Sequence, residues 1–255
     1  MGTQESMNTP TGGGWTAVKR SVPRSFGGTS TFNADAVIGG VIGSADGLGD
    51  GGSGGGGGGS SAASVSGAVS GLSGFGATVA AEGLSAAVDR LGLAELRGKP
   101  PIEVVAAIAA HLAMHAEGPH HDLLETALRD AILECAAIEA DGTYDNLDVS
   151  LQSFLSNLGV EGLIESFLSI FVFDRLWSWI EKHAAEKVDL MGDTLAMASA
   201  VKESCRNHVQ QLMSEVRDEG HFEQVDWFGI QGKQLAESIV ETLEFRLNLL
   251  RNEEQ

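Results

Sequence analysis

The residue of this sequence best suited to chemistry is Gly2. Because the second residue is small, removal of Met1 would leave glycine with a free α-amine. Such an amine has a pKa of roughly 7.7–8.0, so a useful fraction is neutral and nucleophilic near neutral pH. Gly2 and Ser6 also fit the N-myristoylation pattern, which requires a second membrane signal that is weak here. The residues alone therefore leave open both a reactive terminal amine and a lipid attachment at Gly2.

A short basic and aromatic cluster follows in an otherwise acidic chain. Its members are Trp15, Lys19, Arg20, Arg24 and Phe26, with glycines on both sides. Two interpretations are open: the cluster docks on the chain's own acidic helices, or a partner protein grips it.

Four histidines lie close together, but the spacing does not make a convincing metal site. His111 and His115 are four residues apart, and His120 and His121 follow. The intervening Leu-Ala-Met lacks the glutamate of the zinc hydrolase motif. We expect a partly exposed helix end and no metal.

Residues 141–152 resemble a calcium loop only at its start. Asp141, Thr143 and Asp145 fit the first ligand positions, but Asn146 replaces the glycine and Gln152 replaces the bidentate glutamate. These residues are expected to form a turn that caps the next helix.

The two cysteines and the glycine run have no catalytic context. Cys135 and Cys205 each lie alone in a helical pattern, which is typical of small core residues with reduced thiols. The run Gly54–Gly59 lacks the lysine and the preceding strand of a phosphate-binding loop. We interpret it as a linker.

The elements that must position these residues divide the chain into two parts. Of the 34 glycines, 19 lie in residues 1–60, where few large apolar side chains offset the entropy lost on ordering. We predict a flexible Gly/Ser-rich arm over residues 1–60 and an acidic all-helical domain over residues 61–255. Firm structure is expected from about Val79, because glycines weaken the helical pattern before it.

Helical periodicity continues through the second part. The predicted helices cover residues 102–117, 122–139, 147–157, 160–183, 194–219 and 231–251. Gly98 suits a helix end and Pro100-Pro101 the next helix start. The last helix carries an apolar stripe at three- and four-residue spacing, namely Leu235, Ile239, Leu243, Leu247 and Leu250. The predicted fold is all-α, an irregular helical bundle.

Charge and hydropathy limit the possible partners. Residues 101–255 hold 28 Asp and Glu against 10 Lys and Arg, a balance of −18. Such a surface repels phosphate backbones, so we expect no direct nucleic-acid binding and favour a basic protein partner. The most apolar window, 163–180, contains Glu165, Asp174 and Arg175, which predicts a core helix and no membrane span. No secretory signal is recognised, and a cytoplasmic location is expected.

Two stretches resemble the QatB family. They are Gly-Gly-Gly-Trp-Thr-Ala-Val-Lys-Arg at residues 12–20, after an initial Met-Gly-Thr, and Leu-Gly-Leu-Ala-Glu-Leu-Arg-Gly-Lys-Pro-Pro at residues 91–101. QatB proteins are components of bacterial Qat anti-phage defence systems, encoded beside a QueC-like enzyme (QatC), an ATPase (QatA) and a TatD-like nuclease (QatD). Residues 4–6, Gln-Glu-Ser, depart from the small hydroxyl residues expected there.

The resemblance implies that a partner does the chemistry, and that this chain is no enzyme and holds no cofactor. The QueC-like enzyme is expected to use ATP, zinc and 7-carboxy-7-deazaguanine, and to attach the deazaguanine to the amine of Gly2. Thr3 and the basic and aromatic cluster are then expected to bind that partner. The alternative is a helical adaptor that assembles the ATPase and nuclease through a docking peptide, without covalent change. A zinc hydrolase is the third hypothesis.

Overall fold

The prediction of an all-α fold is confirmed. The structure is a computed structural model that describes residues 34–35, 37–38, 60–114, 121–137, 142–184, 191–218 and 225–250. Within these ranges it contains helices and no strand. From residue 60 onward the elements are α3 (Ser60–Glu82), α4 (Leu84–Arg90), the short 3-10 helix η1 (Ala94–Leu96), α5 (Pro101–Ala113), α6 (His121–Ala136), α7 (Tyr144–Ala184), α8 (Met191–Asp218) and α9 (Ile230–Leu249).

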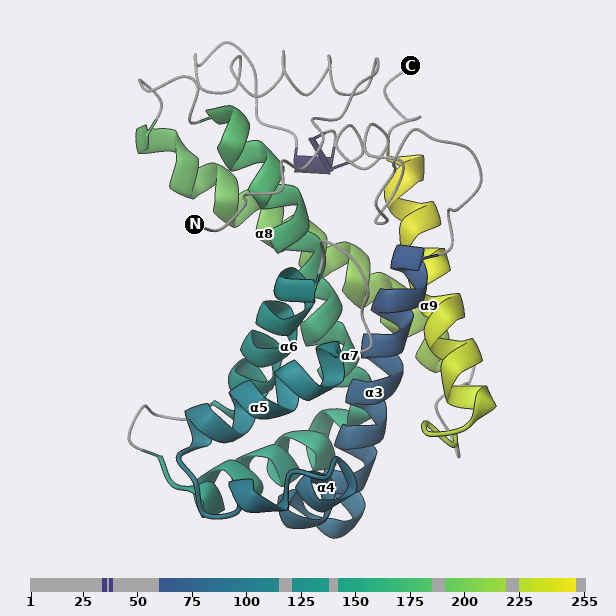
Figure 1. Cartoon of the computed structure of the whole chain (residues 1–255). Helices are drawn as coiled ribbons and strands as arrows, with labels where there is room; N and C mark the ends of the chain where they lie inside the picture. Colours follow the sequence, from purple (N-terminus) through teal and green to yellow (C-terminus); the bar gives the residue numbers. More distant parts are fainter. Residues whose placement is uncertain are drawn as a thin grey trace.

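Helix α3 runs through the centre of the bundle. It packs against α7 and α9 and also contacts α4, α5 and α6, and Figure 1 shows α9 alongside it. Its large apolar side chains are buried, among them Val69, Leu72, Phe75 and Val79. Removal of this apolar surface from water is the main force that holds a helix of such weak intrinsic propensity.

The glycines of α3 allow its neighbours to approach closely. A Cβ atom on Gly74 would lie 2.7 Å from the Phe228 ring, and one on Gly76 would lie 3.0 Å from the Leu163 side chain. Gly71 is similarly close to a leucine of α5, at 3.1 Å. Each glycine costs roughly 1 kcal/mol of helix propensity relative to alanine, but close packing offsets that cost.

Helix α3 therefore begins well before the position at which the sequence predicts firm structure. The expected start near Val79 is wrong, because the glycines before it serve interhelical packing and do not break the helix. The actual start at Ser60 directly follows the glycine run.

Two predicted helix boundaries are confirmed. Gly98 has a φ of +72°, which favours glycine, and Pro101 occupies the first turn of α5. At the start of α7, Thr143 Oγ1 accepts a hydrogen bond from the Asn146 amide at 3.2 Å, and Asn146 Oδ1 accepts one from the Thr143 amide at 3.0 Å. This reciprocal cap is the predicted role of the segment.

Helix α7 is bent near its middle. Gly159 adopts φ 68° and ψ −175°, which is non-helical, and it separates two helical parts where the sequence predicts two helices. Its C-terminal part contributes Phe167, Leu168 and Phe171 to the core. Helices α6 and α8 both pack against α7.

The stretch Tyr144–Ser178 of α7 is long and apolar enough to cross a membrane by length and composition. Half of its most apolar window is buried inside the fold. The bend at Gly159 also interrupts the stretch Tyr144–Ser178. A buried core helix of this kind passes the same test, which agrees with the prediction from its charged residues.

Candidate functional site

The residues predicted to carry the function lie outside the described part of the chain. These are Gly2, Thr3, Trp15, Lys19, Arg20 and Arg24. The structure therefore does not test their roles, which stay predictions.

One short piece of the predicted arm is described, and it is attached to α8. Val37 and Ile38 are 1% and 0% exposed and belong to the core. Asp35 Oδ1 accepts a hydrogen bond from the Ser204 hydroxyl and lies 3.2 Å from His208 Nε2. The glycine content of residues 1–60 gives no indication of this contact. We call residues 34–35 and 37–38 the α8 anchor.

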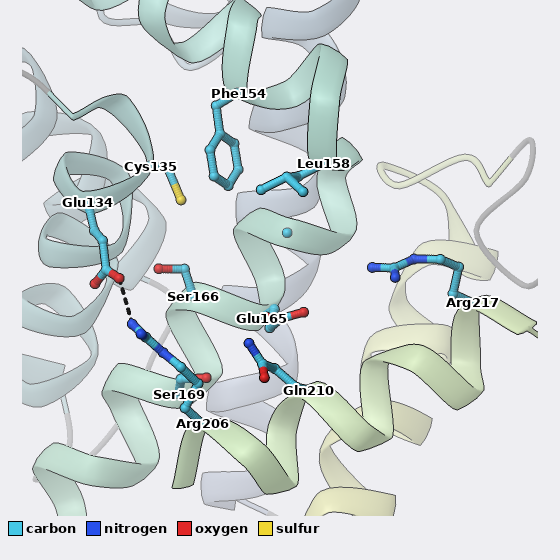
Figure 2. A pocket seen from close by; sticks show the side chains of 11 residues that line it. Glu134, Cys135, Phe154, Leu158, Glu165, Ser166, Ser169, Arg206, Gln210 and Arg217 are labelled. Carbon is cyan, nitrogen blue, oxygen red and sulfur yellow. Dashed lines mark hydrogen bonds and ion pairs between the residues drawn. The ribbon is translucent and has the colours of Figure 1, made fainter. Parts of the chain in front are cut away.

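A cavity of about 270 Å³ lies where α6, α7 and α8 meet. Figure 2 shows Phe154 and Leu158 of α7 on one side and Gln210 of α8 on the other. The two sides of this wall meet at the bend at Gly159. The Phe154 ring packs closely over Gly162, because a Cβ on Gly162 would lie only 3.2 Å from that ring.

The other walls of the cavity are polar. Arg206 donates to the Glu134 carboxylate at 2.8 Å and joins α8 to α6. Ser169 is 7% exposed, and its hydroxyl has no hydrogen-bond partner among the described residues. Arg217 and Glu165 lie on different helices, and neither forms an ion pair within the described part of the chain. The cavity thus combines an apolar wall with charged groups of both signs.

The two cysteines are core residues, as predicted. Both are free and buried. Burial raises the pKa of the Cys135 thiol to about 12, against a smaller opposing effect of the Ser166 hydroxyl. Burial, followed by the nearby Asp35 carboxylate, raises the pKa of Cys205 to about 12. Neither thiol is a thiolate at neutral pH, so neither is an activated nucleophile.

The histidine group is only partly described. His111 lies in the last turn of α5 and His121 begins α6, while His115 and His120 lie outside the described residues. His121 Nδ1 lies 3.5 Å from Asp122 and 4.0 Å from Glu125. Among the described residues, no group of three His, Cys, Asp or Glu side chains could hold a metal ion.

Comparison with known families decides the classification. The family model described as "Qat anti-phage system associated protein QatB" matches residues 53–242, about three quarters of the chain. The chain belongs to the QatB family. As a QatB-family member it is a component of an anti-phage defence system that works with other proteins of that system. No curated protein and no solved structure matches it.

The match covers the helical domain and the cavity but not the N-terminal candidates. It begins at residue 53, so Gly2 and Trp15 lie before it. Sequence reasoning missed the cavity, whose polar residues are spread over three helices. The available signal was the pair Gly159 and Gly162, which interrupts an otherwise apolar helical pattern.

Proposed function

We propose that this QatB-family protein is a non-enzymatic substrate and scaffold, whose Gly2 amine is acylated by a QueC-like partner. The family places it in an anti-phage defence system. The observation that carries the rest of the proposal is the α8 anchor. It fixes the chain at residue 34, and the 33 residues before it can span at most about 110–120 Å when extended.

The chemistry would belong to the partner. The QueC-like enzyme would use ATP to convert the carboxylate of 7-carboxy-7-deazaguanine into an acyl-adenylate with release of pyrophosphate. The neutral Gly2 amine would attack the acyl carbon, AMP would leave, and the nitrogen would lose one proton as the amide forms. This chain would supply only the amine, and its pKa near neutrality keeps a fraction reactive.

The helical domain would supply the docking surface. Its acidic charge favours a basic partner, and attachment of the substrate amine to a docked domain raises its local concentration at the enzyme. Thr3 and the segment Trp15–Arg24 would make the contacts that guide the terminus into the active site. We place the complex in the bacterial cytoplasm.

The direct test incubates the purified chain with the partner, ATP and the deazaguanine acid. We expect the intact mass to rise by the mass of the acid less one water. A Gly2→Trp variant should show no rise, whereas the matched Gly13→Trp variant should react normally. An unchanged mass with a partner that still forms acyl-adenylate would contradict the proposal.

A second candidate is an adaptor that assembles the ATPase and nuclease without covalent change. The observation that favours it is an exposed apolar pair before and at the start of α9, Phe228 at 55% and Ile230 at 75%. Exposed apolar groups of this kind suit a protein interface. An Ile230→Asp change should then abolish co-purification of those partners.

Two deletions separate the candidates. Removal of residues 3–10, which keeps a small second residue, should leave complex formation intact and abolish defence if recognition of the terminus for modification is essential. Removal of residues 15–26 should abolish complex formation if that segment is a docking peptide.

A further inference from the structure

The cavity between α6, α7 and α8 is partly open to solvent, so a small molecule could enter it. It is lined by arginines, carboxylates, hydroxyls and an amide beside an apolar wall, and pockets that hold small ligands combine apolar surface with a few polar groups in this way. Its volume of about 270 Å³ falls just below the usual range of about 300–1,000 Å³ for pockets that hold drug-sized ligands. It therefore suits a small metabolite.

Two solvent-accessible charged side chains and one buried hydroxyl face this space. Figure 2 shows the Arg217 guanidinium and the Glu165 carboxylate pointing toward one another across the gap, yet no ion pair joins them. Ser169 lies between Arg206 and Gln210 in the same view, and its hydroxyl is buried without a hydrogen-bond partner among the described residues. A buried hydroxyl without a partner costs free energy, which a ligand would recover.

The positions of these groups define the ligand chemistry. The Arg217 fork and the Gln210 amide can donate to a carboxylate, while Glu165 can accept from N–H groups at the opposite end. Phe154 and Leu158 offer an apolar wall next to these groups, above them in the view of Figure 2. Glu134 and Arg206 already satisfy each other and serve as a fixed wall.

We propose that this cavity binds a flat ring compound that carries a carboxylate at one end and N–H donors at the other. The ring packs on Phe154 and Leu158, the carboxylate binds Arg217, and the N–H donors bind Glu165 with help from Ser169. Two sources provide this chemistry: free tryptophan, whose indole N–H lies at the end opposite its carboxylate, and the carboxylated deazaguanine named above. Binding at this cavity does not require that Gly2 be modified.

Isothermal titration of the full chain tests the proposal with two probes, L-tryptophan and 7-carboxy-7-deazaguanine. We expect at least one to bind with a stoichiometry of one. Binding of tryptophan alone identifies an amino-acid site, and binding of the deazaguanine acid alone identifies a site for the partner's substrate. Indole, which has the ring without the charged groups, should bind at least roughly tenfold more weakly than tryptophan.

Variants locate the binding at this cavity. Arg217→Ala and Glu165→Gln each remove one charged contact and should weaken binding roughly 10- to 100-fold. Both side chains are partly or fully solvent-exposed, so the fold should survive, as circular dichroism would verify. The control Lys233→Ala, on an exposed position of α9, should bind as the unchanged chain does.

Two results would overturn the proposal. One is the absence of measurable heat with both probes at millimolar concentration. The other is binding that neither Arg217→Ala nor Glu165→Gln weakens. Loss of the mass increase at Gly2 with retained titration heat would refute the proposed function alone, so the two proposals fail separately.

Discussion

Helices α3 and α7 both contain glycines, but the glycines have opposite effects. In α3, Gly74 and Gly76 bring neighbouring side chains within about 3 Å of where a Cβ would stand, and the packing is close. In α7, Gly159 leaves the helical conformation, and a cavity lies beside the bend. The number of glycines in a helix thus indicates neither disorder nor packing. What decides is whether large apolar partners surround them.

The largest expected effect concerns thiol reactivity, which should be low in both regions but lower in the closed one. Cys135 lines the cavity beside α7, whereas Cys205 lies in closed packing on α8. Since both pKa values are about 12, against roughly 8.5 for a free thiol, each should alkylate about a thousandfold more slowly than free cysteine near pH 7. Iodoacetamide labelling followed by peptide mass spectrometry should show Cys135 reacting before Cys205. Equal rates would mean that the cavity does not admit the reagent.

A leucine at Gly76 should destabilise the packing of α3. Its side chain has no space beside Leu163, so we expect the free energy of unfolding in urea to fall by about 2–3 kcal/mol. Gly67 is the matched control, because nothing lies within 4 Å of its Cβ position. Gly67→Leu should gain up to about 1 kcal/mol from helix propensity. If both variants lost stability equally, close packing of α3 would not be the reason for its glycines.

An alanine at Gly159 should oppose the bend of α7. A φ of 68° with an extended ψ is a region that only glycine adopts readily, so we expect a loss of about 1–3 kcal/mol. The exposed neighbour Asn157→Ala is the control and should change stability by less than about 0.5 kcal/mol. Thermal unfolding of the two variants provides the comparison. No loss in Gly159→Ala would show that the bend is not fixed by this residue.

The smallest effect concerns charge. Glu82 is the only charged residue of α3, whereas α7 carries the partly buried Asp174. Burial, with a contribution from Asp130, raises the pKa of Asp174 in the folded state. The ionised form is therefore disfavoured by folding, and stability is lost as pH rises through the unfolded value of about 3.9.

Asp174→Asn removes this cost. The variant should be more stable than the unchanged chain at pH 7, by about 0.5 kcal/mol or less, and the gain should disappear below about pH 3.9. Urea unfolding at several pH values measures the difference. A gain that does not depend on pH would have another cause than ionisation.

Sequence reasoning recovered the parts of the fold that depend on local signals. The apolar stripe of α9 predicts the buried face that includes Ile239, Leu243 and Leu247, and the Thr143 cap and the Pro101 start are readable from their residue types. The start of α3 was not predictable, because its glycines pack against residues that are far away in sequence, such as Phe228.

The candidate sites show the same division. Gly2 and the basic and aromatic cluster can be proposed from sequence, because their chemistry resides in single residues or short segments. The cavity could not, because Glu165 and Arg217 become neighbours only when α7 packs against α8. The α8 anchor likewise joins Asp35 to Ser204 across most of the chain.

The state of the Gly2 amine in the cell tests the central claim most directly. The chain should be purified from cells that contain the QueC-like partner and from cells that lack it, and its N-terminal peptide sequenced by mass spectrometry. We expect an amide-linked deazaguanine on Gly2 in the first preparation and a free amine in the second. A free Gly2 amine in both, with the partner present and active, would contradict the account.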